Sequence, residues 1–364
     1  MSVTIESGDL AAAMKRAAAI VASRNTIPIL ANVRIEAKAG ELEIVTTDLD
    51  LEYRETIAVV DGGGLKTTVE AKRLAPLLGA AAKGSQVKLE IDGAHLVVKA
   101  GRSRWRLPVI GVEDFPQMPT ADLPARLTIK AKVFAEMIGR VFWSRSTEPS
   151  RYYMHGPLMH DLDGKLALAA TNGHTLMRIS GKSQWPVGAP QIILQPKFCQ
   201  AVQSIAAESD GDALIEWDGP KIRFQIGPIT LLAKTIDGVF PDYQRVIPGE
   251  SSDPIVVDPE VMRAAVKRVD LIGNAKTRCV RVSRGDGILS VSAVADDGAR
   301  ASEEFQAEVT ASFEAGFNSQ YVDQMLSAMG GDSITIHHAE ANAQARICRT
   351  VDDGALGVLM PMRI

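Results

Sequence analysis

The sequence predicts an α+β protein made of three copies of one module, because two signals of a strand followed by a helix recur along the chain. The first signal recurs at offsets of roughly 124 and 128 residues, in "VTIESGDLAAAMKRAAAIV", "LTIKAKVFAEMIGRVFWS" and "IVVDPEVMRAAVKRVDLI". The second recurs about 125 residues apart, in "TTVEAKRLAPLLGAA", "QIILQPKFCQAVQSIAA" and "ASFEAGFNSQYVDQMLSAM". Strands outnumber helices and do not alternate regularly with them, so each module is predicted to be two helices packed on antiparallel sheet rather than a doubly wound fold.

The joins between the modules are predicted from composition. Pro, Asp and Ser gather near residues 119–127 and 248–254, as is typical of connecting segments. The predicted domains are therefore residues 1–122, 123–250 and 251–364.

The six helices are predicted from apolar residues at helical spacing. In the middle module Phe134, Met137, Ile138, Val141 and Phe142 follow the spacing i, i+3, i+4, i+7 and i+8, which is typical of a helix lying on a sheet. The predicted helices are residues 8–22, 71–83, 131–145, 196–207, 259–276 and 318–329. Alternating runs such as "ELEIVTTDLDLEYRETI" and "KLALAATNGHTLMRIS" predict the strands between them.

Composition limits the class of protein further. The chain has 364 residues, of which 46% are hydrophobic and 23% are charged, so it can bury two or three cores. No stretch reaches the roughly 20 apolar residues of a membrane span, and "MSVTIESGDL" lacks the features of a signal peptide. We therefore expect a cytoplasmic protein without membrane partners. Cys199, Cys279 and Cys348 are widely spaced and form no metal-binding motif, so they are predicted to be reduced packing residues.

Charge is distributed unevenly between helices and the rest of the chain. The formal net charge is −4, yet the predicted helices hold thirteen Lys and Arg and only five Asp and Glu. A solvated helix face usually mixes both signs, so one interpretation is a shared basic surface directed at phosphates. The other is an ordinary solvated face. The helices carry no cluster of base-reading side chains, so contacts to DNA would be to the backbone and independent of sequence.

Catalytic and metal-binding patterns are not evident. His155 and His160 differ by an odd number, so on a strand they would point to opposite faces and not share a metal; they are predicted to be surface or turn residues. The glycines at 62–64 lack the Lys and the following helix of a phosphate-binding loop. We therefore expect no catalytic residues, no metal and no cofactor.

The end of the sequence, "GALGVLMPMRI", is apolar where chain ends are usually polar. One interpretation is a last strand that closes a sheet. The other is a Met-rich surface that adapts to several partners, because unbranched Met side chains repack at low cost.

Eight stretches together resemble one known family over nearly the whole chain. They are "RNTIPILANV", "TTDLDLE", "GRSRWRLP", "DFPQMP", "RYYMHG", "TNGHTL", "DGVFPDYQRVIP" and "MPMRI". Each is weak alone, but their order and spacing are specific to the bacterial β sliding clamp, the processivity subunit of the DNA polymerase III holoenzyme. The resemblance implies a non-catalytic DNA-clamp fold that encircles double-stranded DNA as a head-to-tail homodimer ring.

The resemblance also implies which residues touch DNA and the second chain. The positions that match DNA contacts are Arg24, Lys72, Tyr152, Tyr153 and Lys197. The positions that match the dimer interface are Arg102, Arg104, Trp105, Leu271, Ile272, Glu303 and Glu304. In that interface Trp105, Leu271 and Ile272 would supply apolar contact, and the two arginines would face the two glutamates.

A pocket for short linear peptides is implied as well. Its partners would be the replicative polymerase, the clamp loader, translesion polymerases, mismatch repair proteins and ligase. The matching positions are Met154, Thr171, Gly173, His174, Thr175, Leu176, Pro241, Arg245, Val246, Val358, Met360, Pro361, Met362 and Arg363. Thr175 stands where the family commonly has Arg, and Asn172 where it commonly has Asp, so the polar rim is expected to prefer a different peptide.

Two alternative functions are compatible with the sequence. One is a nuclease or another DNA-modifying enzyme whose site is not apparent. The other is a paralogous clamp with altered partners, which the unusual residues Thr175 and Asn172 would support.

Overall fold

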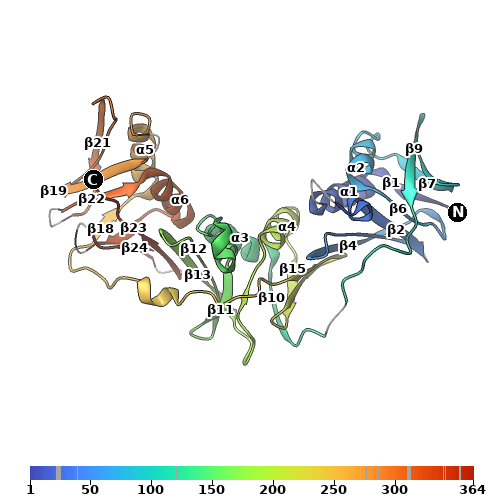
Figure 1. Ribbon diagram of the computed structural model, residues 1–364, viewed down its shortest axis with the longest axis horizontal. Coiled ribbons are helices and arrows are strands. Elements are labelled where there is room, and N and C mark those ends of the chain that lie inside the picture. The colour runs from blue at the N-terminus through green and yellow to red at the C-terminus, as the bar shows by residue number, and fades with distance from the viewer. Residues whose placement is uncertain are drawn as a thin grey trace. The chain divides into compact units, whose positions relative to one another are not determined.

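The computed structural model describes residues 1–21, 26–38, 40–119, 122–274, 277–285, 287–309, 313–338, 340, 342–351 and 354–364. The chain forms two compact units. Unit 1 comprises Met1–Ala135, Gly188–Pro190 and Gln195–Thr235, and unit 2 comprises Glu136–Val187, Gln191–Leu194 and Ile236–Ile364. Figure 1 shows their elements along the chain.

The predicted repeats of a strand followed by a helix are confirmed in all three copies. The first signal gives β1 (Ser2–Glu6) and α1 (Ser7–Ile20), β10 (Ala125–Lys130) and α3 (Ala131–Phe142), and β18 (Ile255–Val257) and α5 (Pro259–Asp270). The second gives β6 (Lys66–Glu70) and α2 (Ala71–Gly79), β14 (Ile192–Ile193) and α4 (Pro196–Ala206), and β22 (Phe313–Asn318) and α6 (Ser319–Met329). Three short 3-10 helices are also present in the described residues: η1 (Pro28–Ala31), η2 (Pro149–Met154) and η3 (Tyr243–Val246).

Helices α1, α2, α3, α4 and α5 end earlier than the sequence predicts, and α2 and α5 depart furthest. Helix α2 stops at Gly79 rather than at residue 83, and α5 stops at Asp270 rather than at residue 276. The start of α5 is fixed by Asp258, whose Oδ1 accepts hydrogen bonds from the backbone N–H groups of Glu260 at 2.8 Å and Val261 at 3.3 Å. Its end precedes Gly273, a residue that weakens helices because it gives the backbone more freedom. Leu271 and Ile272 therefore lie in the turn after α5.

Unit 1 contains one continuous antiparallel sheet. Its strands follow the order β10, β15, β16, β17, β4, β3, β2, β6, β9, β8, β7, β1, β5. The bounds of the strands not yet given are β2 (Asn32–Lys38), β3 (Glu41–Thr47), β4 (Leu51–Ala58), β5 (Asp61–Gly63), β7 (Gln86–Asp92), β8 (His95–Ala100), β9 (Ser103–Ile110), β15 (Asp212–Trp217), β16 (Lys221–Ile226) and β17 (Ile229–Lys234). Strand β4 of the first repeat pairs with β17 of the second, so this sheet crosses a predicted domain boundary.

Unit 2 contains two antiparallel sheets. The larger follows the order β14, β11, β12, β13, β25, β24, β23, β18, and the smaller follows β21, β20, β19, β22. The remaining bounds are β11 (Leu158–Leu162), β12 (Lys165–Thr171), β13 (Thr175–Gln184), β19 (Cys279–Gly285), β20 (Ile288–Val294), β21 (Arg300–Gln306), β23 (Ile334–His337), β24 (Ala345–Arg349) and β25 (Ala355–Leu359). Pairing of β13 with β25 joins the second and third repeats.

The two compact units differ from the three predicted repeats for a structural reason. The middle repeat gives β15–β17 to the sheet of unit 1 and β11–β13 to a sheet of unit 2. Hydrogen bonds between strands therefore cross both joins between repeats, and grouping by contact divides the middle repeat rather than separating it.

The helices bury the apolar faces that their spacing predicts. Phe134, Met137, Ile138 and Val141 of α3 are all buried. Helix α1 packs against α2 and against β3 and β4, and α5 packs against α6 and β20. Figure 1 shows α5 and α6 side by side over their sheets. Each module is thus a layer of two helices on antiparallel sheet, as predicted.

The three cysteines have the free thiols that the sequence predicts. Cys199 is buried, Cys279 and Cys348 are partly buried, and all three are free thiols. Among the described residues, no helix combines the length and the apolar character that crossing a bilayer requires.

A buried histidine, His338, is expected to make stability depend on pH. His338 is buried and meets the ring of Phe317 edge-on at 5.9 Å. Burial, assisted by Arg284, holds the pKa of His338 below its ordinary value of 6.5. The unfolded chain then binds the proton more readily, so stability present above pH 6.5 is lost as the pH falls toward the lowered folded-state pKa.

We expect the free energy of unfolding to decrease between pH 7.5 and 5.5, and His338→Gln to remove part of this slope. Urea titrations of both proteins at several pH values measure the effect. An identical slope in the variant would show that His338 is not responsible.

Candidate functional site

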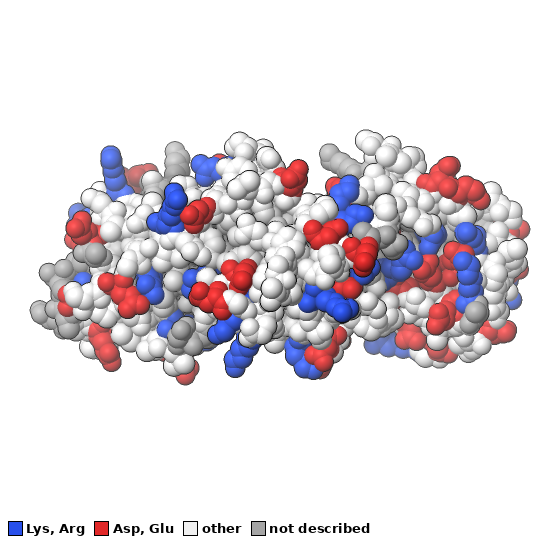
Figure 2. Space-filling view, turned by 90° about the horizontal axis from the view of Figure 1, so that it is seen from below, with Lys and Arg blue, Asp and Glu red and all other residues white. Residues whose placement is uncertain are grey.

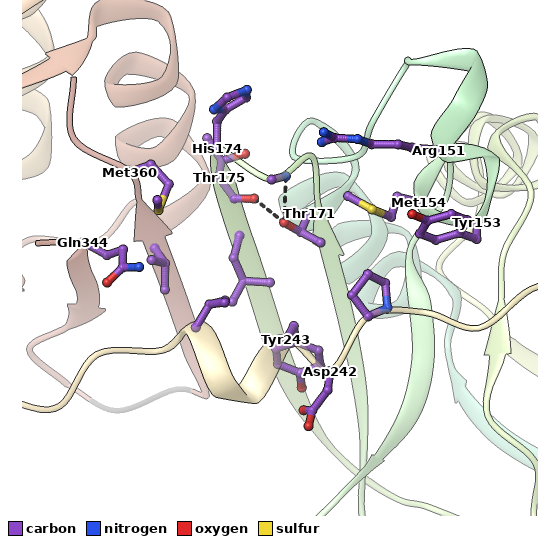
Figure 3. A pocket seen from close by; sticks show the side chains of 15 residues that line it. Arg151, Tyr153, Met154, Thr171, His174, Thr175, Asp242, Tyr243, Gln344 and Met360 are labelled. Atoms are coloured by element: carbon purple, nitrogen blue, oxygen red, sulfur yellow. Dashed lines mark hydrogen bonds between the residues drawn. The ribbon is translucent and has the colours of Figure 1, made fainter. Parts of the chain in front are cut away.

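An apolar cavity of about 410 Å³ lies in unit 2, between parts of the second and third repeats. Its walls come from η2, the turn between β12 and β13, the segment that contains η3, and the end of β25. The lining residues are Arg151, Tyr153, Met154, Thr171, Gly173, His174, Thr175, Leu176, Pro241, Asp242, Tyr243, Val246, Gln344, Val358 and Met360. Figure 3 shows Met360 and Gln344 on one side, Arg151, Met154 and Tyr153 on the opposite side, and Tyr243 and Asp242 below them. The part of the cavity wall formed by the buried Tyr243 is called its floor.

The turn at residues 171–175 is held by its own side chains. Asn172 Oδ1 accepts hydrogen bonds from the N–H groups of His174 at 2.9 Å and Thr175 at 2.8 Å, and from Thr175 Oγ1 at 3.1 Å. Thr171 Oγ1 donates to the Thr175 carbonyl at 2.7 Å and accepts from Gly173 N at 3.2 Å. These bonds fix one edge of the cavity without help from a ligand.

Gly173 and Arg151 meet at this edge. Gly173 has φ +89°, in the left-handed region, and a Cβ atom there would lie 2.9 Å from Arg151 Nη1. The same Nη1 donates to the Asn172 carbonyl at 3.2 Å. The backbone conformation therefore favours glycine, and any larger residue would also make the Arg151 guanidinium shift.

Thr175 presents no free hydroxyl to the cavity. Its side chain is buried, and its Oγ1 donates to Asn172 and accepts from Ser144 Oγ at 2.7 Å. The resemblance places Arg at this position in many relatives, so in this chain the wall is uncharged where a guanidinium would otherwise stand. Arg151, which donates to the Asn172 carbonyl at this same edge, supplies positive charge there, and it pairs with Glu148 at 3.1 Å.

The apolar walls combine buried and accessible side chains. Met154, Leu176 and Val358 are buried, whereas Val246 is 47% exposed and Met360 is 39% exposed. The Met360 N–H donates to the His174 carbonyl at 2.9 Å, and the His174 ring stacks on Tyr321 at 6.3 Å. The accessible Val246 and Met360 are the residues that an incoming apolar side chain would cover.

Tyr243 in the cavity floor forms a buried polar pair with His160 behind it. The Tyr243 hydroxyl lies 3.0 Å from His160 Nε2, and both side chains are buried. Burial raises the pKa of Tyr243 and lowers the pKa of His160. The prediction that His160 is a surface or turn residue is therefore wrong, because β11 directs this ring inward against η3 rather than toward solvent.

Ten of the fourteen positions expected at the peptide pocket line this cavity. The other four are Arg245, Pro361, Met362 and Arg363. Arg245 is exposed and its Nε pairs with Asp242 at 2.9 Å. Met362 N donates to the Gly316 carbonyl at 2.8 Å, and Met362 and Arg363 line a separate cavity of about 710 Å³ against the smaller sheet.

Five lining residues were not predicted from the sequence. They are Arg151, Tyr153, Asp242, Tyr243 and Gln344. Tyr153 was expected to touch DNA, and Arg151, Asp242 and Tyr243 lie within the quoted "RYYMHG" and "DGVFPDYQRVIP" stretches. Only Gln344 has no signal in the sequence.

The apolar end includes a last strand, as one interpretation predicts, although this strand lies within its sheet rather than closing it, and the adaptable surface stays a prediction. Residues Ala355–Leu359 form β25, which pairs with β13 and β24 inside the larger sheet. The next residue, Met360, leaves the strand and lines the cavity.

The residues expected at DNA lie on helices and on η2. Tyr152 is 53% exposed and contacts the Tyr153 ring edge-on at 5.7 Å. Lys72 is exposed on α2. Lys197 on α4 is ion-paired with Asp48. Arg24 lies outside the described residues.

Many basic helix residues lie in ion pairs with acids of their own unit, and the interpretation as a shared basic surface stays a prediction. Ion pairs within the units engage Arg16, Arg73, Lys132, Lys197, Arg263, Lys267 and Arg268. Arg263 and Lys267 share Asp323, a helix residue that the count of charges already included, whereas the partners of the other five lie outside the helices. Figure 2 shows a different face, seen from below the view of Figure 1, on which Lys and Arg are interspersed with Asp and Glu.

Arg140 has a structural contact that distinguishes it from a phosphate-binding residue. Its Nε donates to the Ala328 carbonyl at 2.7 Å and its Nη2 to the Met329 carbonyl at 3.1 Å, at the end of α6. The last carbonyls of a helix receive no hydrogen bond from a backbone N–H group of that helix. The Arg140 guanidinium supplies the missing donors, and its positive charge interacts favourably with the helix dipole.

We expect Arg140→Met to lower the free energy of unfolding by about 2 kcal/mol and to leave DNA affinity unchanged. Urea denaturation and fluorescence anisotropy with duplex DNA measure the two quantities. The control is Lys132→Met on the exposed face of α3, which should change stability little. A loss of DNA affinity at wild-type stability would contradict the capping role.

The residues expected at a dimer interface lie near two strand edges. In the described structure, β9 pairs with β8 along its length but with β6 only at Val109 and Ile110, so residues 103–108 have an open edge. Strand β21 ends the smaller sheet and is open on its outer side. Arg102 and Arg104 are exposed at the first edge, where Trp105 is partly buried, and Glu304 is exposed at the second.

Among the residues expected at the dimer interface, Leu271 and Ile272 are exposed, whereas Glu303 is already ion-paired. Leu271 is 83% exposed and Ile272 is 39% exposed in the turn after α5. Glu303 accepts a hydrogen bond from Arg268 Nε at 2.7 Å, so it already has a partner in its own chain. An intermolecular ion pair of Glu303 would have to share that carboxylate with Arg268.

The modules and the pocket together define a sliding clamp: three copies of two helices on antiparallel sheet, with an accessible apolar cavity between the second and third copies. Models of the DNA polymerase III beta subunit match nearly the whole chain, the N-terminal domain over residues 1–119, the central domain over 128–242 and the C-terminal domain over 244–363. The chain belongs to the DNA polymerase III beta subunit family. The members of this family are processivity factors without catalytic activity. The alternative that the chain is a DNA-modifying enzyme is therefore wrong.

Individual relatives match this chain over their full lengths. The beta sliding clamp of Caulobacter vibrioides is 32% identical over 374 residues, covering 100% of both chains, and that of Escherichia coli is 25% identical over 368 residues, also covering 100% of both. The crystal structure of the sliding clamp of Bartonella birtlesii bound to griselimycin matches with a TM-score of 0.95, 31% identity and full coverage of both chains.

Proposed function

We propose that two copies of this sliding clamp close head to tail into a ring that encircles duplex DNA. The first repeat of one chain would meet the third repeat of the other, with the open edge of β9 adding to the open edge of β21. The exposed Leu271 and Ile272 and the partly buried Trp105 would form the apolar contact. Arg102 and Arg104 would face Glu304 and the shared Glu303 carboxylate.

Inside the ring the contacts to DNA would be few and exchangeable. Arg24, Lys72, Tyr152, Tyr153 and Lys197 would touch the sugar–phosphate backbone, which carries no sequence information. Lys197 would exchange Asp48 for a phosphate. Because most basic helix side chains have acidic partners, the grip on DNA would be weak, sensitive to salt and compatible with sliding.

The cavity of unit 2 would bind short linear peptides of the replicative polymerase, the clamp loader, translesion polymerases, mismatch repair proteins and ligase. The observation that supports this most is the convergence of ten expected positions from four segments of the chain on one accessible apolar cavity. Tethering a polymerase to a ring on DNA makes each rebinding event intramolecular, which raises its effective concentration at the primer end. That is the physical origin of processivity here.

In this proposal the chain is divided into three clamp domains, at residues 1–122, 123–250 and 251–364. The protein would act in the cytoplasm. Clamp function needs neither cofactor nor metal.

Primer extension tests the proposal. The replicative polymerase, with clamp loader and ATP, copies singly primed circular DNA, and the length of product made per binding event is measured with and without this chain. We expect the chain to lengthen the products, and griselimycin to shorten them again by occupying the cavity. Products of unchanged length would contradict the function and would favour a paralogous clamp that serves other partners.

A further inference from the structure

The buried pair of His160 and Tyr243 lies directly behind the cavity. His160 is on β11 and Tyr243 begins η3, 83 residues later in the sequence. The rings meet edge to face with centroids 5.6 Å apart. Tyr243 lines the cavity, so any change at His160 reaches the cavity through this contact.

The hydrogen bonds define where the protons are. His160 Nδ1 lies 2.7 Å from the backbone carbonyl of Asp161. A carbonyl can only accept, so Nδ1 carries the hydrogen and, in the neutral ring, Nε2 is the acceptor. The Tyr243 hydroxyl, 3.0 Å away, therefore donates to His160 Nε2.

The surroundings of this pair favour the neutral imidazole. On β13, Arg178 lies close enough to lower the pKa of both His160 and Tyr243. Asp161 on β11 acts on His160 in the opposite direction, and Asp242 precedes Tyr243 at the rim of the cavity. Burial is the largest cause of the lowered His160 pKa.

Protonation of His160 would disturb the cavity floor. With both ring nitrogens acting as donors, the Tyr243 hydroxyl would have to accept from Nε2 and direct its own hydrogen elsewhere. The Arg178 and Gln244 side chains already hydrogen-bond to the hydroxyl as donors, and of the two only the Gln244 amide has an oxygen that could accept if it turned over. The hydroxyl would therefore lose His160 as its acceptor, and the Tyr243 side of the cavity would have to rearrange or leave a buried hydroxyl unsatisfied, which is costly.

We propose that His160 is a positioning residue of the peptide pocket: its neutral ring holds Tyr243 in the floor, so that protonation of His160 and binding of a ligand oppose each other. This inference rests on the proposed peptide-binding function. A ligand in the cavity excludes water from the Tyr243 side of the pair, which makes the imidazolium still less favourable. By linkage, acid must weaken ligand binding by the same coupling.

The test measures griselimycin affinity of the full-length protein by calorimetry from pH 7.5 to 5.0. For the unmodified chain we expect the dissociation constant to rise at least about threefold at the acid end. In His160→Gln an amide oxygen can still accept from Tyr243 but does not titrate. We expect this variant to bind within about twofold of the unmodified chain at pH 7.5 and to remain constant toward pH 5.0.

The matched variant Tyr243→Phe keeps the ring and removes the hydroxyl. It should bind more weakly at pH 7.5, because the floor loses its anchor and His160 loses its donor. Circular dichroism of each variant establishes folding. The same loss of affinity with acid in His160→Gln as in the unmodified chain would overturn the inference while leaving the pocket intact.

A second readout does not depend on any variant. The His160 imidazole is titrated by NMR in the unmodified protein, with and without griselimycin. We expect its pKa to fall on binding, and an unchanged pKa would overturn the inference. If the unmodified chain does not bind griselimycin at pH 7.5, the proposed pocket itself fails, and the inference fails with it.

Discussion

Leu271→Asp is expected to separate the ring into monomers. Leu271 is 83% exposed in one chain, although a large aliphatic side chain gains by burial. In the proposed ring it enters the apolar contact with Trp105 of the second copy, where an unpaired carboxylate would be strongly unfavourable. We expect the dimer dissociation constant to rise at least about 100-fold, as measured by sedimentation velocity over a range of concentrations.

The matched control for this variant is Val351→Asp. Val351 is 81% exposed in the same unit but lies outside the proposed interface. It should leave the dimer unchanged. Dimers of equal stability in both variants would place the interface elsewhere.

Val246→Asp is expected to lower ligand affinity at the pocket by at least about tenfold, or about 1.4 kcal/mol. Val246 lines the cavity and is 47% exposed. The charge therefore reaches the bound ligand without entering the core. An apolar ligand group would have to desolvate the carboxylate, which is unfavourable. Griselimycin titration by calorimetry measures the loss.

Val239→Asp is the control for the pocket variant. Val239 is 87% exposed, lies seven residues earlier in the same segment and does not line the cavity. It should bind griselimycin like the unmodified chain, and both variants should remain dimers. Equal affinity for Val246→Asp and the unmodified chain would place the ligand outside this cavity.

The repeat was predictable because helix formation on a sheet follows local rules. Apolar spacing located all six helices, and the recurrence of the signal located the strand before each helix, including the two-residue β14. The ends of α2 and α5 were predicted too late because apolar spacing continues beyond them into turns. Leu271 and Ile272 are thereby left in an exposed turn rather than on a helix.

The joining of repeats through their sheets was not predictable in the same way. Pairing of β4 with β17 and of β13 with β25 involves strands far apart in the sequence. A strand's alternation shows which face is buried but not which neighbour it pairs with. Grouping the chain by repeats therefore did not anticipate two compact units.

The site was predictable by resemblance and only partly by chemistry. Segments near 154, 175, 241 and 358 converge as expected, whereas Met362 pairs with Gly316 on the smaller sheet. Gly316 allows this approach, since a Cβ atom there would lie 2.8 Å from the Met362 carbonyl oxygen. Ion pairs such as Lys197 with Asp48 also escaped prediction, because sequence gives the charge of a side chain but not its partner across 149 residues.

Topological linkage to DNA is the central claim, and one measurement tests it most directly. The chain is loaded onto nicked circular DNA by a compatible clamp loader with ATP, separated from free protein, and divided into two portions, one of which is linearised with a restriction enzyme. A ring that encircles the duplex is predicted to stay on the circle and to be lost from the free ends of the linear DNA. Equal retention on circular and linear DNA would show adhesion to the surface of the duplex and would contradict the ring.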